Sequence, residues 1–162
     1  MQLLVISDSH GKTKPIRILL DRYKNTVQAV VHLGDNAKDL LDLQPDYEDI
    51  SFIAVAGNCD YYNEAPKERI LTFTKPVRKQ ILLLHGHTLN VKMTLNRLMY
   101  YAQEKGVDAC LFGHTHASFV DRHGPVFYMN PGSIGEPRGQ CKASYGLLSI
   151  GDDEITGEVR VL

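Results

Sequence analysis

The sequence contains no tryptophan, and its three cysteines, Cys59, Cys110 and Cys141, form no CxxC pair. An odd number of cysteines without that spacing is expected for reduced thiols in a cytosolic protein rather than for a disulfide framework. Long hydrophobic runs are absent as well. None approaches the ~18 residues needed to cross a bilayer, and the opening segment MQLLVISDSHG lacks the basic start and long apolar stretch of a secretory signal. We therefore expect a cytoplasmic protein with no membrane partner.

An excess of charge of either sign is also missing. The 18 Lys and Arg residues against 19 Asp and Glu residues give a formal net charge of -1, so no field of the whole molecule attracts it to nucleic acid, and we expect no stable nucleic-acid binding. The chain has no repeat, no low-complexity segment and no stretch with the composition of a linker. Its length fits one ordinary domain, which we predict to span residues 1–162.

Short apolar runs recur along the chain and are nearly continuous rather than alternating, as in strands that are buried on both faces. There are five of them: Leu3–Ile6, Ala29–Val31, Phe52–Ala56, Ile81–Leu84 and Ala109–Phe112. Helical periodicity separates them, with one helix predicted to be capped by Thr13 and another to run from a cap at Asn90 to Gly106. This order of strand and helix predicts an α/β layered domain with parallel strands.

The last third of the sequence has a different pattern. Apolar segments flank short turns there and predict two antiparallel hairpins that form a second sheet, Ala117–Arg122 with Val126–Met129 and Tyr145–Ile150 with Glu154–Val161. A smaller hairpin is predicted around Lys75 and Pro76, pairing Ile70–Thr74 with Val77–Leu84.

Each of the five apolar runs stops at a polar cluster. These clusters are Ser7-Asp8-Ser9-His10, Gly34-Asp35-Asn36, Gly57-Asn58-Cys59-Asp60, His85-Gly86-His87 and Gly113-His114-Thr115-His116. In α/β sheets, ligands bind at the carboxyl ends of parallel strands. Taken singly, each of these residues is more often a turn or cap residue than a ligand. Their joint occurrence at five strand ends predicts one shared site.

The side chains gathered there are carboxylates, imidazoles and one amide, namely Asp8, Asp35, His10, His85, His114, His116 and Asn58. Nitrogen and oxygen donors without thiolates suit Mn²⁺, Fe, Co²⁺, Ni²⁺ or Zn²⁺ rather than a soft metal or an all-oxygen Ca²⁺ cage. Seven donors exceed what one tetrahedral metal uses. They predict two metal ions that share a bridging carboxylate at roughly 3.5–4 Å, with a bridging hydroxide that attacks phosphorus in line. Manganese is the metal that we expect, with nickel, cobalt, iron or zinc as alternatives.

The ordered series Asp8-x-His10, Gly34-Asp35, Gly57-Asn58-x-Asp60, His85-Gly86 and Gly113-His114-x-His116 resembles the calcineurin-like metallophosphoesterases. Together with Asn130-Pro131-Gly132-Ser133 and Pro137-Arg138, it is most similar to the compact prokaryotic phosphodiesterases of the YfcE type. The resemblance covers almost the whole chain. It implies a two-sheet β-sandwich flanked by helices in αββα layers, a dinuclear metal centre, and a small phosphodiester as substrate. It does not determine the oligomeric state, and a homo-oligomer is one of the possibilities.

The resemblance also assigns the ligands by matching position. It implies that Asp8, His10 and His116 hold the first metal, that Asp35 bridges both metals, and that the second metal is held by Asn58, His85 and His114. The catalytic residues that it implies are Asp35, Asn58, Cys59 and Asp60.

Cys59 is the one departure from the pattern of the wider family, in which a histidine oriented by the following acidic residue assists the leaving group. Here a thiol stands at that position and Asp60 is retained, so the source of the leaving-group proton is open. Cys110 lies in an apolar run and is predicted to be a small buried hydrophobic residue. Cys141 is predicted to be exposed and incidental.

Other polar residues near the motifs have two interpretations each. His32 lies inside an apolar run and is predicted to be a hydrogen-bonded core histidine. His87 either contacts substrate or binds water or backbone, and Arg138 either holds a phosphate oxygen or is solvated. Tyr61 and Tyr62 either stack on an aromatic leaving group or pack between loop and helix.

Three functions compete with a phosphoesterase. A non-catalytic scaffold of the same fold exists in the retromer sorting coat, but its metal-ligand set is eroded, whereas all seven positions here carry competent ligands. A metallo-β-lactamase-type hydrolase requires an HxHxDH run, and a dinucleotide-binding oxidoreductase requires GxGxxG after the first strand; both are absent. The sequence therefore favours a metal-dependent phosphodiesterase.

Overall fold

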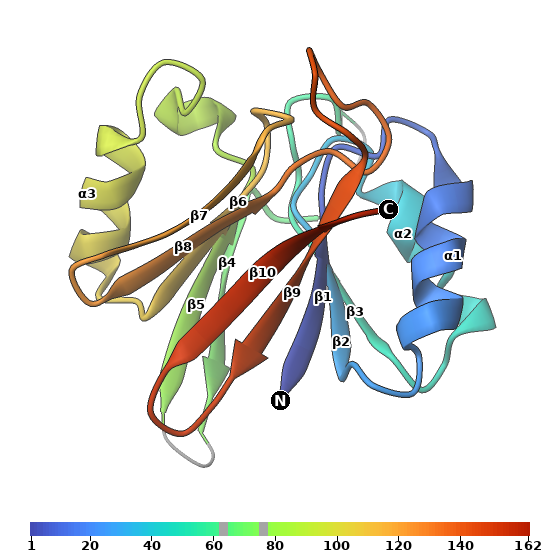
Figure 1. The fold of residues 1–162 in the computed structure, drawn as a ribbon, viewed down its shortest axis with the longest axis horizontal. Coiled ribbons are helices and arrows are strands. Elements are labelled where there is room, and N and C mark those ends of the chain that lie inside the picture. Colours follow the sequence, from blue (N-terminus) through green and yellow to red (C-terminus); the bar gives the residue numbers. More distant parts are fainter. Residues whose placement is uncertain (62–64, 75–77) are drawn as a thin grey trace.

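The computed structural model describes residues 1–61, 65–74 and 78–162. It contains two five-stranded sheets packed face to face (Figure 1). In spatial order the first sheet consists of β10 (Ile155–Val161), β9 (Ser144–Ile150), β1 (Gln2–Ile6), β2 (Ala29–His32) and β3 (Ser51–Ala54). The second consists of β4 (Glu68–Phe73), β5 (Lys79–Leu84), β6 (Ala109–Phe112), β8 (Val126–Pro131) and β7 (Ser118–His123).

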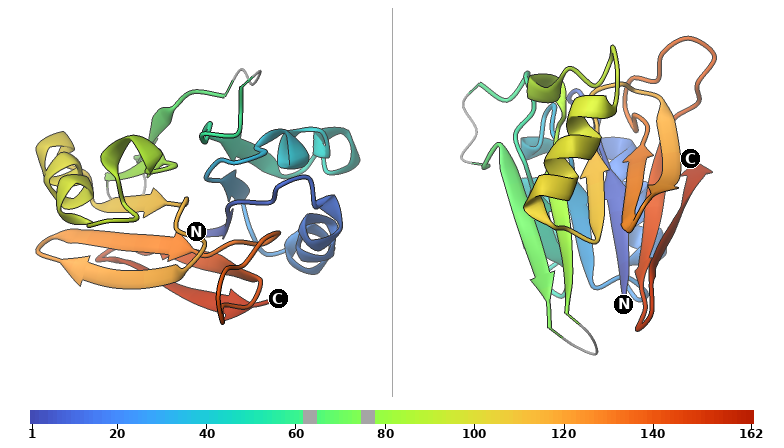
Figure 2. Two further views of the ribbon diagram at one scale, coloured as in Figure 1. Left: turned by 90° about the horizontal axis from the view of Figure 1, so that it is seen from above. Right: turned by 90° about the vertical axis from the view of Figure 1, so that its left-hand side faces the viewer.

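Helices cover the outer faces of both sheets (Figures 1 and 2). On the first sheet lie α1 (Thr13–Tyr23) and α2 (Lys38–Leu41), and on the second lies α3 (Asn96–Lys105). Two 3-10 turns, η1 (Gln44–Asp46) and η2 (His87–Leu89), complete the elements of the described residues. The αββα layering is therefore confirmed. No helix in the described ranges has the length and apolar character needed to span a membrane.

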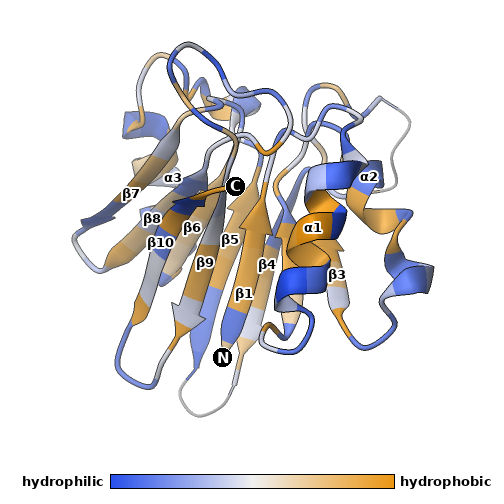
Figure 3. Cartoon of the chain, turned by 45° about the vertical axis from the view of Figure 1, so that its right-hand side comes forward, coloured by the Kyte–Doolittle hydropathy of each residue, from blue (hydrophilic) through white to orange (hydrophobic). Residues whose placement is uncertain are grey.

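Three apolar clusters fill the spaces between the layers, and alternate residues of one strand belong to different clusters. In β1, Leu3 and Val5 pack between the two sheets, whereas Leu4 and Ile6 pack under α1. A third cluster packs β5, β6 and β8 against α3. In Figure 3 the central strands are mostly hydrophobic and the loops mostly hydrophilic. Both faces of these strands are buried, which explains why their sequences are continuously apolar.

The strands that lead to the polar clusters run in parallel within each sheet. Strand β1 pairs in parallel with β2, and β2 with β3; β5 pairs in parallel with β6, and β6 with β8. The five predicted runs are thus divided between the two sheets. The prediction that the two late hairpins form a second sheet is wrong, because β7 and β8 join β6 whereas β9 and β10 join β1.

The helix starts differ from the sequence prediction. Helix α1 begins at Thr13, and no side chain caps it. Helix α3 begins at Asn96, because Asn90 lies in a left-handed turn that closes η2 instead of opening the helix. Gly106 ends α3 in a left-handed conformation, as predicted.

The smaller hairpin is confirmed in its paired residues, since β4 and β5 are antiparallel from Glu68 opposite Leu84 to Phe73 opposite Lys79. Its predicted turn residues, Lys75 and Pro76, lie outside the described residues, as does Val77.

His32 ends β2 and is a fully buried, hydrogen-bonded core histidine, as predicted. The backbone N–H of Gly34 donates to its Nδ1 at 3.1 Å. The proton of the neutral ring is therefore on Nε2, which donates to the Ser9 hydroxyl at 2.9 Å, and Ser9 donates to Asp39 Oδ2 at 2.6 Å. This chain of bonds ties the loop after β1 to the start of α2. Burial lowers the pKa of His32 to about 4.

The depressed pKa of His32 predicts a loss of stability in mild acid. Between pH 6.5 and about 4 the unfolded chain binds a proton here that the folded protein excludes, so the free energy of unfolding falls as pH falls through this window. The contribution is at most roughly 3 kcal/mol at about 1.4 kcal/mol per pH unit. Urea unfolding across this window should show a shallower pH slope for His32→Gln than for wild type, whereas His123→Gln, at an exposed turn, should retain the wild-type slope. Identical slopes for wild type and His32→Gln would contradict the assignment.

Candidate metal centre

The polar clusters from both sheets converge at the carboxyl ends of the parallel strands. Asp8 follows β1 and Asp35 follows β2, whereas His85 follows β5 and His114 follows β6. Five of the seven predicted ligands have a positive φ, a conformation that non-glycine residues rarely adopt and that costs about 1–3 kcal/mol each. They are Asp8 (53°), His10 (47°), Asp35 (59°), His114 (69°) and His116 (60°). The backbone is thus strained at these loops, and strain of this kind is typical of functional sites.

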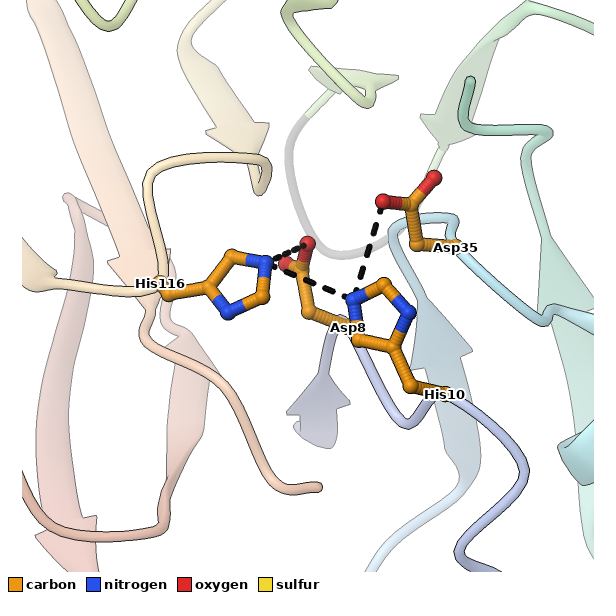
Figure 4. A group of neighbouring side chains, drawn as sticks. All are labelled: Asp8, His10, Asp35 and His116. Carbon is orange, nitrogen blue, oxygen red and sulfur yellow. Dashed lines mark hydrogen bonds and ion pairs between the residues drawn. The ribbon is translucent and has the colours of Figure 1, made fainter. Parts of the chain in front are cut away.

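Two groups of donor atoms lie at this end of the molecule, and Asp35 belongs to both. The first group is Asp8, His10, Asp35 and His116, whose donor atoms all lie within 4.8 Å of one another (Figure 4). His116 Nε2 lies 3.1 Å from Asp8 Oδ1 and 3.4 Å from His10 Nε2. His10 Nε2 in turn lies 3.7 Å from Asp35 Oδ2.

The second group is Asp35, His85 and His114, with donor atoms within the same 4.8 Å. His85 Nε2 lies 3.3 Å from Asp35 Oδ1 and 3.2 Å from His114 Nδ1. Asn58, the seventh predicted ligand, is exposed, and its amide nitrogen donates to Cys59 Sγ at 3.3 Å. The structure therefore brings six of the seven residues into the two groups and places Asn58 in the loop beside them.

Two buried imidazoles are oriented by backbone carbonyls. His85 Nδ1 lies 2.7 Å from the carbonyl of Leu33, and His116 Nδ1 lies 2.5 Å from that of Glu136. A carbonyl only accepts hydrogen bonds, so Nδ1 carries the proton in both rings and Nε2 of each neutral ring presents a lone pair. These lone pairs face carboxylate oxygens, an arrangement that is repulsive unless a proton or a metal cation lies between them.

Among the described residues, histidine is the only ionisable basic side chain that pairs with the two carboxylates. Asp8 and Asp35 are 0% and 2% exposed, and neither forms an ion pair with a Lys or Arg in the part of the chain that the structure describes. The Oδ1 atom of Asp8 is buried and has no hydrogen-bond donor among these residues. Buried charges in proteins are paired or bind metals. The donor set and this orphaned oxygen therefore fit a bound metal cation.

The close approach of carboxylates and imidazoles shifts the pKa values of both kinds of group. Burial alone would raise the pKa of Asp8 and Asp35, but the imidazoles of His116 and His85 beside them outweigh it, so both pKa values are lowered. Burial would likewise lower the pKa of His85 and His116, and the neighbouring carboxylates raise both instead. Burial and the charge of His85 lower the pKa of His114 to about 4.

Asp60 fixes the loops after β2 and β3. Its Oδ2 accepts the backbone N–H groups of Asp35 at 2.9 Å and Gly57 at 2.8 Å, and its Oδ1 accepts that of Ala37 at 3.0 Å. The N–H of Cys59 donates to Asp35 Oδ1 at 2.8 Å. Partial burial and the charge of Asp35 raise the pKa of the exposed Cys59 thiol to about 11. These contacts hold Asp35 in place and keep the Cys59 thiol protonated at neutral pH.

The end of β8 and the segment that follows it hold the loops that carry Asp8 and His114. Asn130 Nδ2 donates to the carbonyl of Gly113 at 2.8 Å, and the Ser133 hydroxyl donates to the carbonyl of Asp8 at 2.8 Å. Sequence analysis missed Ser7, whose hydroxyl donates to Asp8 Oδ2 at 2.5 Å. It also missed the carbonyls that orient His85 and His116, because a backbone carbonyl has no signature in the sequence.

The remaining residues lie at the surface or in the core. Cys110 is buried and Cys141 exposed, as predicted. Arg138 is exposed, and Tyr61 is 83% exposed and so does not pack between loop and helix. The stacking hypothesis for Tyr62 falls outside the described residues.

Solved and curated proteins share this architecture. Probable metallophosphoesterase YsnB of Bacillus subtilis is 34% identical, with 96% of this chain and 88% of that protein covered. Phosphodiesterase YfcE of Escherichia coli K12 is 27% identical, with 99% and 98% covered. The Zn²⁺ complex of Vps29 from Entamoeba histolytica has a TM-score of 0.77 over 99% of this chain and 98% of that one, and at 23% identity it shows the fold alone.

A model of the calcineurin-like phosphoesterase superfamily domain matches residues 1–153, which include all seven predicted ligands. This match, the αββα sandwich and the two groups of donor atoms agree with the similarity to YsnB. The chain therefore belongs to the calcineurin-like phosphoesterase superfamily.

Proposed function

We propose that this protein is a phosphodiesterase that works with two divalent metal ions, with manganese as the expected metal. The proposal rests on the two groups of donors that share Asp35, and above all on the Nε2 atoms of His85 and His116, which face buried carboxylates. Asp8, His10 and His116 would hold one metal, Asn58, His85 and His114 the other, and Asp35 both. The preference for diesters is supported by the similarity to a relative named phosphodiesterase.

When bound, the two ions supply Lewis acidity toward phosphate oxygens and generate a nucleophile from water near neutral pH. The residues of this chain hold and orient them. Leu33 and Glu136 fix the two imidazoles through their carbonyls, and Asp60 and the Cys59 N–H hold the loop and the carboxylate of Asp35. On the open side, exposed Asn58 and Cys59 are placed to meet the substrate, which we take to be a small phosphodiester.

A metal-binding scaffold without catalysis is the second candidate, because a Vps29 of the same fold is solved with Zn²⁺ and a related structure is named for vacuolar protein sorting. Both candidates bind metal, so metal content does not separate them. Turnover of bis(p-nitrophenyl) phosphate by metal-reconstituted protein does, and its absence with every one of the five candidate metals would favour the scaffold.

Because both proposed metal sites share Asp35, substitutions at the ligands should change the metal content in different ways. Elemental analysis after reconstitution should give two metal ions per wild-type chain. Asp35→Asn should lower the affinity of both sites together, because Asp35 neutralises both cations, whereas His116→Ala should lower mainly one. The matched control is Asp42→Asn, because Asp42 is an exposed aspartate at the C-terminal end of α2 that pairs with Lys38; this variant should retain two metal ions. Saturation at a single metal in wild type, or two metals in Asp35→Asn, would contradict the proposal.

Because a thiol stands at position 59, we expect the rate of hydrolysis to depend strongly on the pKa of the leaving group. General acid assistance is typically worth ~10²–10⁴-fold, so without a strong acid beside the scissile bond the rate should fall steeply as the leaving-group pKa rises. A series of aryl and alkyl diesters at fixed metal and pH measures this slope. Cys59→Ala should lower kcat only modestly and leave the slope unchanged, and Cys59→His should flatten it.

The control for this series is Cys141→Ala, because Cys141 is exposed and remote from the five clusters in sequence. It should match wild type throughout. A shallow slope in wild type that steepens in Cys59→Ala would show that the thiol donates the proton and would overturn the expectation.

A further inference from the structure

A cavity of about 320 Å³ lies beside the candidate metal centre. It is bounded by the start of β4 and the end of β5, which belong to the second sheet, and by the turn η2 and helix α3, which lie on the outer side of that sheet (Figure 2). Its lining includes His85, so one wall of the cavity is shared with the group formed by Asp35, His85 and His114. The lining also includes Lys67, Glu68, His87, Leu89 and Tyr101. Its volume falls within the range of small-molecule sites.

The wall next to the metal centre is fixed by its backbone. Gly86 and Asn90 bracket η2 with φ values of +99° and +58°, and the N–H of Leu89 donates to the carbonyl of Gly86 at 3.1 Å. A Cβ on Gly86 would approach Val91 Cγ2 to 2.9 Å, so the turn packs tightly against the residues that follow it. The cavity is therefore formed before any ligand binds, which lowers the entropic cost of binding.

Besides His85, two residues with ring side chains, His87 and Tyr101, line the cavity together with apolar residues. The His87 ring stands 5.4 Å from that of His85 and 6.1 Å from that of His114, which places it between the metal centre and the cavity. On the helix side, the Tyr101 hydroxyl donates to Glu68 at 2.7 Å, so the Tyr101 ring is held in place. Leu84 and Leu89 supply apolar surface between them. Rings and aliphatic side chains of this kind favour a planar, largely apolar group.

Charge at the mouth of the cavity agrees with an anionic ligand. Glu68 is tied to Tyr101 and to Lys105, whose ammonium lies 3.6 Å from its carboxylate. Lys67 is exposed and forms no ion pair with the residues of the described ranges. Lys67 therefore contributes a positive charge to the lining of the cavity that is unpaired among the described residues and that would attract a phosphate ester.

We infer that this cavity receives the organic group of the phosphodiester, and that this group carries an aromatic ring, of aryl or nucleobase type, that contacts His87 and Tyr101. An apolar cavity of about 150 Å³ already admits benzene, so the volume here accommodates a ring with substituents. The inference rests on the proposed function, because it requires the phosphate to be held beside His85. It makes His87, Leu89 and Tyr101 the residues that determine substrate specificity.

Two phosphonates that differ only in a ring test the inference by binding alone. Calorimetric titration of metal-reconstituted protein should give a Kd for benzylphosphonate about tenfold or more below that for methylphosphonate, since burial of a phenyl ring contributes at least that much. Tyr101→Ala removes one wall of the cavity, and Thr88→Trp fills the cavity from its exposed rim. Each variant should bring the ratio of the two Kd values close to one. Tyr101→Phe keeps the ring and should preserve the ratio.

The matched control is Tyr100→Ala, because Tyr100 is the neighbour of Tyr101 on α3, is 74% exposed and does not line the cavity. It should preserve the wild-type ratio. As a second measurement, amide chemical shifts on addition of benzylphosphonate should change at residues 84–89 and 101 beyond the changes caused by methylphosphonate.

The outcomes separate this inference from the proposed function. A wild-type Kd ratio near one, or a ratio that survives both Tyr101→Ala and Thr88→Trp, overturns the cavity assignment even if bis(p-nitrophenyl) phosphate is hydrolysed. A tenfold ratio that the two variants abolish supports the assignment, and loss of turnover in such a protein would count against the catalytic proposal alone. Failure of both phosphonates to bind at millimolar concentration overturns both.

Discussion

Two buried carboxylates, which pair with histidines but with no Lys or Arg of the described residues, constrain the end of the molecule where the parallel strands converge. Asp8 and Asp35 lie where strands of one sheet end, and the lone pairs of His85 and His116 approach them from the other sheet. Nitrogen and oxygen lone pairs held at 3.1 to 3.3 Å repel each other unless a proton or a metal cation lies between them. The two-sheet sandwich therefore holds electron-pair donors close together, and a bound metal cation would relieve the repulsion between their lone pairs.

Holding these donors requires strained backbone and very close packing. The positive φ values at the ligand positions are maintained by neighbouring loops with no room to relax. A Cβ on Gly57 would lie 2.3 Å from Asp35 Oδ1, and a Cβ on Gly113 would lie 2.1 Å from the Ser7 hydroxyl. Only glycine permits the loops after β3 and β6 to approach Asp35 and Asp8 so closely. The site is preorganised by its loops, so little of it has to move when a metal binds.

The layers and the strand-end clusters were predictable because both depend on local pattern. Strands buried on two faces are apolar throughout, and the turn after each strand exposes its polar residues at one edge. The partition into two sheets was not predictable, since the partner of each late hairpin is decided by packing across the whole chain. The start of α3 was misplaced because Asn90 adopts a left-handed turn that its identity permits but does not require. The carbonyls of Leu33 and Glu136, which orient two of the imidazoles, are invisible in a sequence.

The central claim is that the buried donors hold two cations which share Asp35. Anomalous diffraction from crystals grown with manganese, recorded at its absorption edge, tests it most directly. The account predicts two peaks roughly 3.5–4 Å apart on either side of the Asp35 carboxylate, one beside Asp8, His10 and His116 and the other beside His85, His114 and Asn58. A single peak in this region, or two peaks of which either lies out of reach of Asp35, would contradict the account.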